Sequence, residues 1–243
     1  MPEVPTPPAP YARAGSQRLL QIAIHRKPEL LLLALRRSGA LGSAEDVTWR
    51  SPLVEQRFRE YRDAAAIRQI GLLDKLKTPL SGFWPARGPV WDALGVSSTS
   101  AAVLVEAKAN IPEAASPASA ASPASLAIIE RSLAAARRHY APKASAAWSK
   151  TFYQYANRLA HLYFLRRVNG LDARLVFLYF INAHDVEGPA SEEEWRGACR
   201  LLHAALGLPK DITRHGVYEA FVDARVLAVG SSGSTSPFHR ETT

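Results

Sequence analysis

The stretch that decides the fold is VLVEAK, residues 103–108, in which an apolar run ends in two charged side chains. Its β-branched composition is typical of a strand, and side chains in a strand alternate between the two faces. Glu106 and Lys108 are two residues apart and therefore point to the same side. Charged groups at the end of an apolar strand are costly to bury without a partner, so this position indicates a functional site.

A second strand is expected just before this one. Residues 89–96 and 101–109 are short β-favouring runs separated by SSTS (97–100), which predicts an antiparallel hairpin. Asp92 is expected inside the first of these strands, next to Glu106. A divalent ion between the two carboxylates would neutralise both, and the Lys108 ammonium could orient a water or a phosphate oxygen. Such hard donors favour Mg²⁺ or Mn²⁺ over zinc.

Helices and further strands are expected on both sides of the hairpin. Residues 16–37 are helical in pattern, with a second helix beginning at Pro28, and a helix beginning at Ser51-Pro52 is predicted by apolar residues at helical spacing. The remaining expected elements are helices over about 126–139 and about 151–167, a buried strand over 175–181, a helix from the capping box Ser191/Glu194 to near Gly207, and a strand over 217–226. This order predicts an α/β fold, a mixed β-sheet flanked by helices.

The composition favours one domain. The chain has 243 residues of which 47% are apolar, and we expect a single domain over 16–229 between disordered tails over 1–15, which is Pro-rich, and 230–243. The low-complexity stretch EAASPASAASPAS (113–125) is expected to loop out over the surface as an insertion or linker.

Charge and cysteine content narrow the class of protein. The 30 Lys plus Arg residues against 22 Asp plus Glu give a net charge of +8, which makes a polyanion such as nucleic acid a plausible partner. The single Cys199 excludes an internal disulfide and a thiolate metal cage. No apolar run is long enough for a membrane helix and no signal peptide is visible, so we expect no membrane association and a cytoplasmic location.

The sequence resembles the PD-(D/E)XK nuclease superfamily, which has the restriction-endonuclease-like fold. The superfamily signature is an acid on one strand and acid, any residue, lysine on the next, and the match here is Asp92 followed by Glu106-Ala107-Lys108. The stretches FWPARGPVWDALG (83–95) and VLVEAKANIPE (103–113) resemble an uncharacterised bacterial group within it, and the resemblance covers roughly residues 50–182. One departure is Trp91, where the signature has proline.

The resemblance implies a Mg²⁺-dependent (or Mn²⁺-dependent) nuclease that hydrolyses phosphodiester bonds in nucleic acid, with DNA favoured over RNA. It implies that Asp92, Glu106 and the carbonyl of Ala107 ligate the metal, while Lys108 positions or activates the water. Members of the superfamily often add an acid from the preceding helix. Glu55 and Glu60 are the candidates, and Glu60 is preferred because it follows an apolar seam, although a solvated glutamate is an equal alternative.

A polar stripe runs along the expected helix 151–167. Gln154, Asn157, Arg158 and His161 share one face, which either contacts water or faces the active-site cleft. Exonuclease-like members of the superfamily carry a glutamine at the start of this helix, and Gln154 matches it, whereas the tyrosine four residues later is Arg158 here. The resemblance therefore implies substrate-binding roles for Gln154 and Arg158, whose guanidinium suits a phosphate.

Two alternatives stay open at this point. The same fold could serve as a catalytically inactive nucleic-acid-binding or assembly module. The chain could also be an unrelated interaction protein in which the Glu-x-Lys pattern is accidental, and Asp92 and Lys108 would then lie far apart.

Overall fold

One five-stranded mixed sheet organises the protein. The computed structural model describes residues 10–150 and 152–228, and its strands are hydrogen-bonded in the order β1-β2-β3-β4-β5. This confirms the α/β class with a mixed sheet flanked by helices. The strands are β1 (Val47–Ser51), β2 (Ala93–Ser97), β3 (Ala102–Lys108), β4 (Ala173–Ile181) and β5 (Val217–Asp223).

The sheet combines antiparallel and parallel strand pairs. The β2–β3 pair is the expected antiparallel hairpin, and β1 adds antiparallel to β2. The pairs β3–β4 and β4–β5 are parallel, which requires long crossovers. The first crossover holds α4 (Ile111–Ala114), α5 (Pro123–Tyr140), α6 (Tyr153–Tyr163) and the π-helical turn η4 (Phe164–Val168), and the second holds α7 (Glu192–Leu206).

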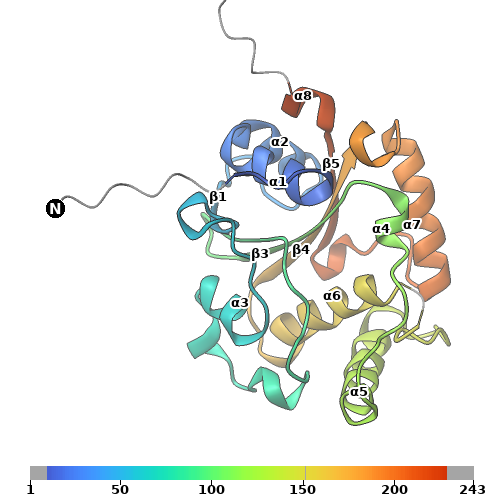
Figure 1. Cartoon of the computed structure of the whole chain (residues 1–243). Coiled ribbons are helices and arrows are strands. Elements are labelled where there is room, and N and C mark those ends of the chain that lie inside the picture. Colours follow the sequence, from blue (N-terminus) through green and yellow to red (C-terminus); the bar gives the residue numbers. More distant parts are fainter. Residues whose placement is uncertain (1–9, 151, 229–243) are drawn as a thin grey trace, which may run out of the picture.

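Two apolar layers cover the two faces of the sheet. On β3, Leu104 belongs to the core beneath α5, α6 and α7, whereas Val103 and Val105 belong to the core beneath α1 (Gly15–His25) and α2 (Pro28–Arg37). Figure 1 shows α1 and α2 on one side of the strands and α5 and α6 on the other. The apolar run of β4 is buried on both faces, as predicted. The capping box is confirmed, since the Glu194 N–H donates to Ser191 Oγ over 3.2 Å.

The prediction of a helix that begins at Ser51-Pro52 is wrong. The chain forms strand β1, the 3₁₀ turn η1 (Val54–Gln56), a loop, and then α3 (Asp63–Gln69). Arg57 and Phe58 have φ values of 54° and 57°, which an α-helix does not accommodate. Phe58 packs on Tyr11, with ring centroids 5.1 Å apart, while Tyr61 forms a β-bridge with Trp91. Tyr61 belongs to the core beneath α5, α6 and α7, whereas Phe58 is buried outside both cores, so their helical spacing does not form one apolar face.

Three boundaries also differ from expectation. Asp92 directly precedes β2 instead of lying inside a strand, and β5 ends at Asp223, where α8 (Ala224–Ala228) begins. Part of residues 10–15 is packed, because Tyr11 contacts Phe58 and the Ala12 N–H donates to Gln21 over 2.8 Å. The rest of the two expected tails, residues 1–9 and 229–243, lies outside the described residues.

Within the described ranges no helix is long and apolar enough to cross a membrane.

One ion pair joins the loop before β1 to the start of β4. Both terminal nitrogens of Arg174 donate to the Glu45 carboxylate, over 2.8 and 3.0 Å, and the Gly42 N–H donates to it over 2.6 Å. The hydrogen bonds from Arg174, followed by that from Gly42, lower the pKa of Glu45 to about 2. The charged form is therefore favoured in the folded protein over the unfolded chain.

We expect Glu45→Gln to lower the free energy of unfolding at neutral pH by about 1 kcal/mol, a value that allows for solvent screening. Because the folded-state pKa is depressed, the contribution is complete above the ordinary glutamate pKa and is lost as pH falls through about 2. Urea unfolding across that pH range should show the variant and the wild type converging in acid. Asp46→Asn is the control, since Asp46 is 73% exposed and pairs weakly with Arg36. A gap for Glu45→Gln that stays constant with pH would contradict the assignment.

Candidate active site

A buried carboxylate, Glu106, lies at the centre of the candidate site and is only 2% exposed. Its Oε1 is 2.5 Å from Lys108 Nζ, and its Oε2 is 2.6 Å from Arg158 Nε and 2.5 Å from the nearer terminal nitrogen of Arg158. Burial by itself raises the pKa of Glu106, but the charges of Arg158 and Lys108 outweigh it and hold the pKa below its ordinary value. Glu106 is therefore a charged group shared by two cations.

Side-chain alternation along β3 and the four-residue spacing on α6 bring the charged and polar groups of the site together. Glu106 and Lys108 extend from β3 on the face that carries Leu104, and α6 packs across that face. Gln154 and Arg158 are four residues apart on α6, so they lie one above the other on its surface. Gln154, Asn157 and Arg158 of the polar stripe line the cleft, and Asn157, Arg158 and His161 are buried, so the stripe is not a water-exposed face.

The ammonium of Lys108 is held in place by two acceptors. It donates to Glu106 Oε1 over 2.5 Å and to Gln154 Oε1 over 3.0 Å. An ammonium carries three N–H groups, so one remains for a water or a ligand oxygen. Gln154 is itself anchored, because its backbone N–H donates to Ser116 Oγ over 2.8 Å.

Asp92 reaches the same place from the residue position just before β2. Its Oδ2 accepts the Ala107 N–H over 2.7 Å. Burial, and after it the charge of Glu106, raises the pKa of Asp92 to about 8. The N–H and C=O of one strand residue point to the same side, so the Ala107 carbonyl also faces the Asp92 side. Asp92 and Lys108 are thus brought to one end of the hairpin.

The donors at this end suit a hard divalent ion. Two carboxylates and a backbone carbonyl are the oxygen ligands that Mg²⁺ and Mn²⁺ prefer. Each oxygen of Glu106 keeps a lone pair besides the one that accepts a cation. Within the described part of the chain no three His, Cys, Asp or Glu side chains form a metal cluster. Asp92, Glu106 and the Ala107 carbonyl are the groups at this end that could hold such an ion.

Glu60 lies near the site but not on a helix. It occupies the loop between η1 and α3, and the Tyr61–Trp91 bridge brings this loop beside Asp92. The Gln17 amide donates to Glu60 Oε1 over 2.9 Å. Burial raises the pKa of Glu60, and the charge of Glu106 adds to this effect. Glu60 therefore lies close enough to Glu106 to be affected by its charge. Glu55 is exposed.

Most donors of Arg158 are used within the protein. Besides Glu106, its guanidinium donates to Asn157 Oδ1 over 2.9 Å and to the Val90 carbonyl over 2.8 Å. It also lies over the ring of Trp91, 4.9 Å from the centroid. Three of its five N–H groups donate in these hydrogen bonds, and the terminal nitrogen that donates to Val90 is also ion-paired with Glu106. The geometry makes Arg158 first of all a partner of Glu106.

His161 is the remaining member of the polar stripe. Its ring is surrounded by apolar core side chains. Its Nδ1 donates to the Asn157 carbonyl over 2.8 Å, and its Nε2 has no hydrogen-bond partner among the residues described. Burial lowers the pKa of His161 to about 3, so the ring is neutral. It takes no charged role at the site.

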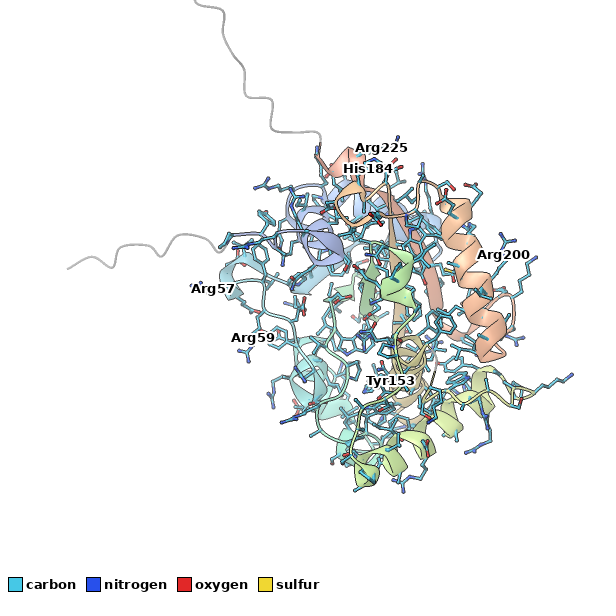
Figure 2. The ribbon with its side chains drawn as sticks, turned by 45° about the vertical axis from the view of Figure 1, so that its right-hand side comes forward. Arg57, Arg59, Tyr153, His184, Arg200 and Arg225 are labelled. Atoms are coloured by element: carbon cyan, nitrogen blue, oxygen red, sulfur yellow. The ribbon has the colours of Figure 1, made fainter. Side chains whose placement is uncertain are left out.

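The site opens into a cleft of about 690 Å³. One wall comes from Pro112 to Ala118, so part of the low-complexity segment lines the cleft, and its last residues begin α5. None of residues 113–125 is buried, so the segment lies at the surface as expected, but along the cleft. Tyr153, at the start of α6, also lines the cleft and lies centrally in Figure 2. The lining residues that sequence reasoning missed include Arg87, Glu113, Ser116 and Tyr153.

A simple signal could have pointed to Arg87, since it lies in the turn PARGP (85–89), a few residues before Asp92. The missed wall had no such signal, because Ala, Ser and Pro are typical of linkers.

Comparison with protein-family models, with curated proteins and with solved structures finds no match. The resemblance to the PD-(D/E)XK superfamily therefore depends on the residues of the chain itself, chiefly Asp92, Glu106 and Lys108.

Proposed function

We propose that this chain is a metal-dependent nuclease of the PD-(D/E)XK type that hydrolyses phosphodiester bonds in nucleic acid, DNA being favoured over RNA. The observation that carries the proposal is the convergence of Asp92, Glu106 and Lys108 at one end of β2 and β3, beside a cleft of about 690 Å³. An acid, a second acid and a lysine around one cleft are the groups that phosphodiester hydrolysis needs.

Asp92, Glu106 and the Ala107 carbonyl would hold the Mg²⁺ or Mn²⁺. When bound, such an ion offsets the negative charge of a phosphate and lowers the pKa of a water molecule. Glu106 contributes a carboxylate that stays ionised because Lys108 and Arg158 hold its pKa down. Asp92 has a pKa raised to about 8 and is kept in position by the Ala107 N–H, so it is poised to exchange a proton for a cation.

Lys108 orients the reacting groups. Its bonds to Glu106 and Gln154 leave one N–H to direct at the attacking water or at a phosphate oxygen. Because both acceptors are on rigid elements, the ammonium does not have to be reorganised during the reaction. Gln154 thereby serves as a positioning residue and also lines the cleft, where its amide can meet a substrate.

Positive charge around the cleft supports a polyanionic substrate. Arg87 lines the cleft and its side chain is exposed, while Arg57, Arg59 and Arg62 are exposed on the loop that carries Glu60. Figure 2 shows Arg57 and Arg59 projecting outward from that loop. Clustered arginines of this kind bind phosphates without reading sequence.

A second function is favoured by one specific contact. Both oxygens of Glu106 are paired with cations, and a buried ion triad of this kind can be purely structural. The same fold would then be a nucleic-acid-binding or assembly module without turnover. Metal binding and cleavage, measured separately, distinguish the two functions.

We expect Asp92→Asn and Lys108→Met to fail in different ways. Asp92→Asn loses a charged ligand and should bind Mn²⁺ at least about tenfold more weakly, while Lys108→Met keeps both carboxylates and should bind Mn²⁺ nearly normally. Cleavage should fall at least about a hundredfold in both. Calorimetry with Mn²⁺ beside single-turnover cleavage of single- and double-stranded substrates tests this.

Asn keeps the acceptor for the Ala107 N–H, so we expect Asp92→Asn to fold normally, and thermal melts of both variants serve as the control. Full cleavage by Lys108→Met would refute the catalytic role of the lysine. Nucleic-acid binding without cleavage by the wild type under any metal would favour the inactive module.

We expect Arg87→Ala to weaken nucleic-acid binding in a salt-dependent way. Losing one phosphate contact should reduce the slope of log affinity against log salt by about 0.7 to 0.9. Arg200→Ala is the matched control, because Arg200 is an exposed arginine on α7, well separated from Tyr153 in Figure 2. Equal slopes for Arg87→Ala and the wild type would place Arg87 outside the interface.

A further inference from the structure

A second, strongly basic hollow of about 430 Å³ lies away from the candidate active site. It is formed by the end of α5, the π-helical turn η4, the residues just before β4, and the turn η6 (Thr213–His215) just before β5. Its lining side chains include three arginines and two histidines, namely Arg166, Arg167, Arg214, His139 and His215.

The two sites are at opposite ends of the same strands. In the parallel register Ala102 pairs with Ala173 at the hollow, whereas Glu106 pairs with Phe177 at the candidate active site. Four residues of strand separate the two ends, about 13 Å. The α6–η4 segment connects them, because it begins with Gln154 and Arg158 at the cleft and ends with Arg166 and Arg167 at the hollow.

The charge of the hollow is unbalanced. The Lys77 ammonium lies beside Gly170, which adds a fourth permanent cation to the three arginines at the rim. The acids nearby are Asp172, 3.6 Å from Arg166, and Asp211, which accepts the N–H and hydroxyl of Thr213. Four cations against two carboxylates leave an excess of about two positive charges, which matches a phosphate group.

The histidines are arranged to donate. Arg214 Nε donates to His215 Nε2 over 3.2 Å, so His215 carries its proton on Nδ1. That Nδ1 lies 3.2 Å from His139 Nε2 and donates to it, which leaves the Nδ1–H of His139 as a donor. Burial lowers the pKa of both histidines, and the neighbouring arginines lower it further, so the rings stay neutral. The tautomer of each ring thus follows from the hydrogen bond that Arg214 donates to His215.

Arg166 is built into the fold. Its terminal Nη1 donates to the Ala173 carbonyl over 2.7 Å, which sets the guanidinium at the start of β4. Gly216 leaves the necessary room, because a Cβ there would lie 2.8 Å from that nitrogen and its φ is +79°. The π-helical turn that carries Arg166 is an irregularity frequently found at functional sites.

We propose that this hollow binds a phosphate group, held by Arg166, Arg167 and Arg214 with the His139 imidazole as an additional donor. Arginine and neutral imidazole N–H groups are the donors that recognise phosphate oxygens, and the hollow is of the size of small-ligand sites. The phosphate belongs either to a free phosphorylated compound or to the backbone of a bound nucleic acid. The proposal does not depend on the nuclease function.

The test is calorimetric titration of the metal-free protein with pyrophosphate. We expect Arg167→Ala and Arg214→Ala each to weaken binding by about tenfold, the loss of one charge-assisted hydrogen bond. Both side chains are exposed, so the variants should melt like the wild type. Arg200→Ala, which removes the same charge from α7, should bind as the wild type does, and Lys108→Met reports any pyrophosphate held in the cleft. Unchanged affinity in both Arg167→Ala and Arg214→Ala would overturn the proposal.

A second titration identifies the source of the phosphate. If it belongs to nucleic acid, Arg214→Ala should reduce the salt slope of oligonucleotide binding by about 0.7 to 0.9. An unchanged slope together with lost pyrophosphate affinity identifies a free phosphorylated compound. Neither titration measures cleavage, so a failed nuclease assay and a failed phosphate site are separate results.

Discussion

The buried charge of Glu106 is the constraint on which the arrangement of this end of the protein depends. A carboxylate that is 2% exposed is tolerated only if its charge is balanced and its oxygens are hydrogen-bonded. Lys108 comes from the same strand and Arg158 from a helix 52 residues further along the chain. The packing of α6 on β3 is therefore specified by polar contacts as well as by the apolar core. Arg158 extends the arrangement to the Val90 carbonyl, which secures the loop that leads into Asp92.

The candidate site is built at the point where the sheet changes from antiparallel to parallel pairing. The β2–β3 hairpin brings Asp92 to the Ala107 N–H, and the crossover from β3 to β4 brings α6 and the low-complexity segment over the same strand end. The small side chains of that segment suit a wall that must lie close to a cleft. Its attachment to Gln154 through Ser116 connects the wall to the residue that holds Lys108.

Positive charge is distributed along one rigid segment. The α6–η4 segment carries Arg158 at the carboxyl end of β3 and Arg166 and Arg167 at the amino end of β4. The arginines at the two ends have different surroundings. Arg158 is paired with a buried acid and serves the internal structure of the cleft. Arg166 and Arg167 border a hollow whose cations exceed its acids, so they are available to an anion. A chain with a net charge of +8 thus places its arginines in separate roles.

Local patterns in the sequence determined the hairpin, the buried strand β4, the capped helix α7 and the pairing of Glu106 with Lys108 on one face, because each depends on a short period or a cap. The same reasoning failed at residues 51–65, where apolar side chains at helical spacing share no single core and positive φ values at Arg57 and Phe58 prevent a helix. It could not show that Arg158 would balance Glu106, or that Ala, Ser and Pro residues would form a cleft wall. Those features join residues far apart in the chain, and only the packing of the crossover helices on the sheet decided them.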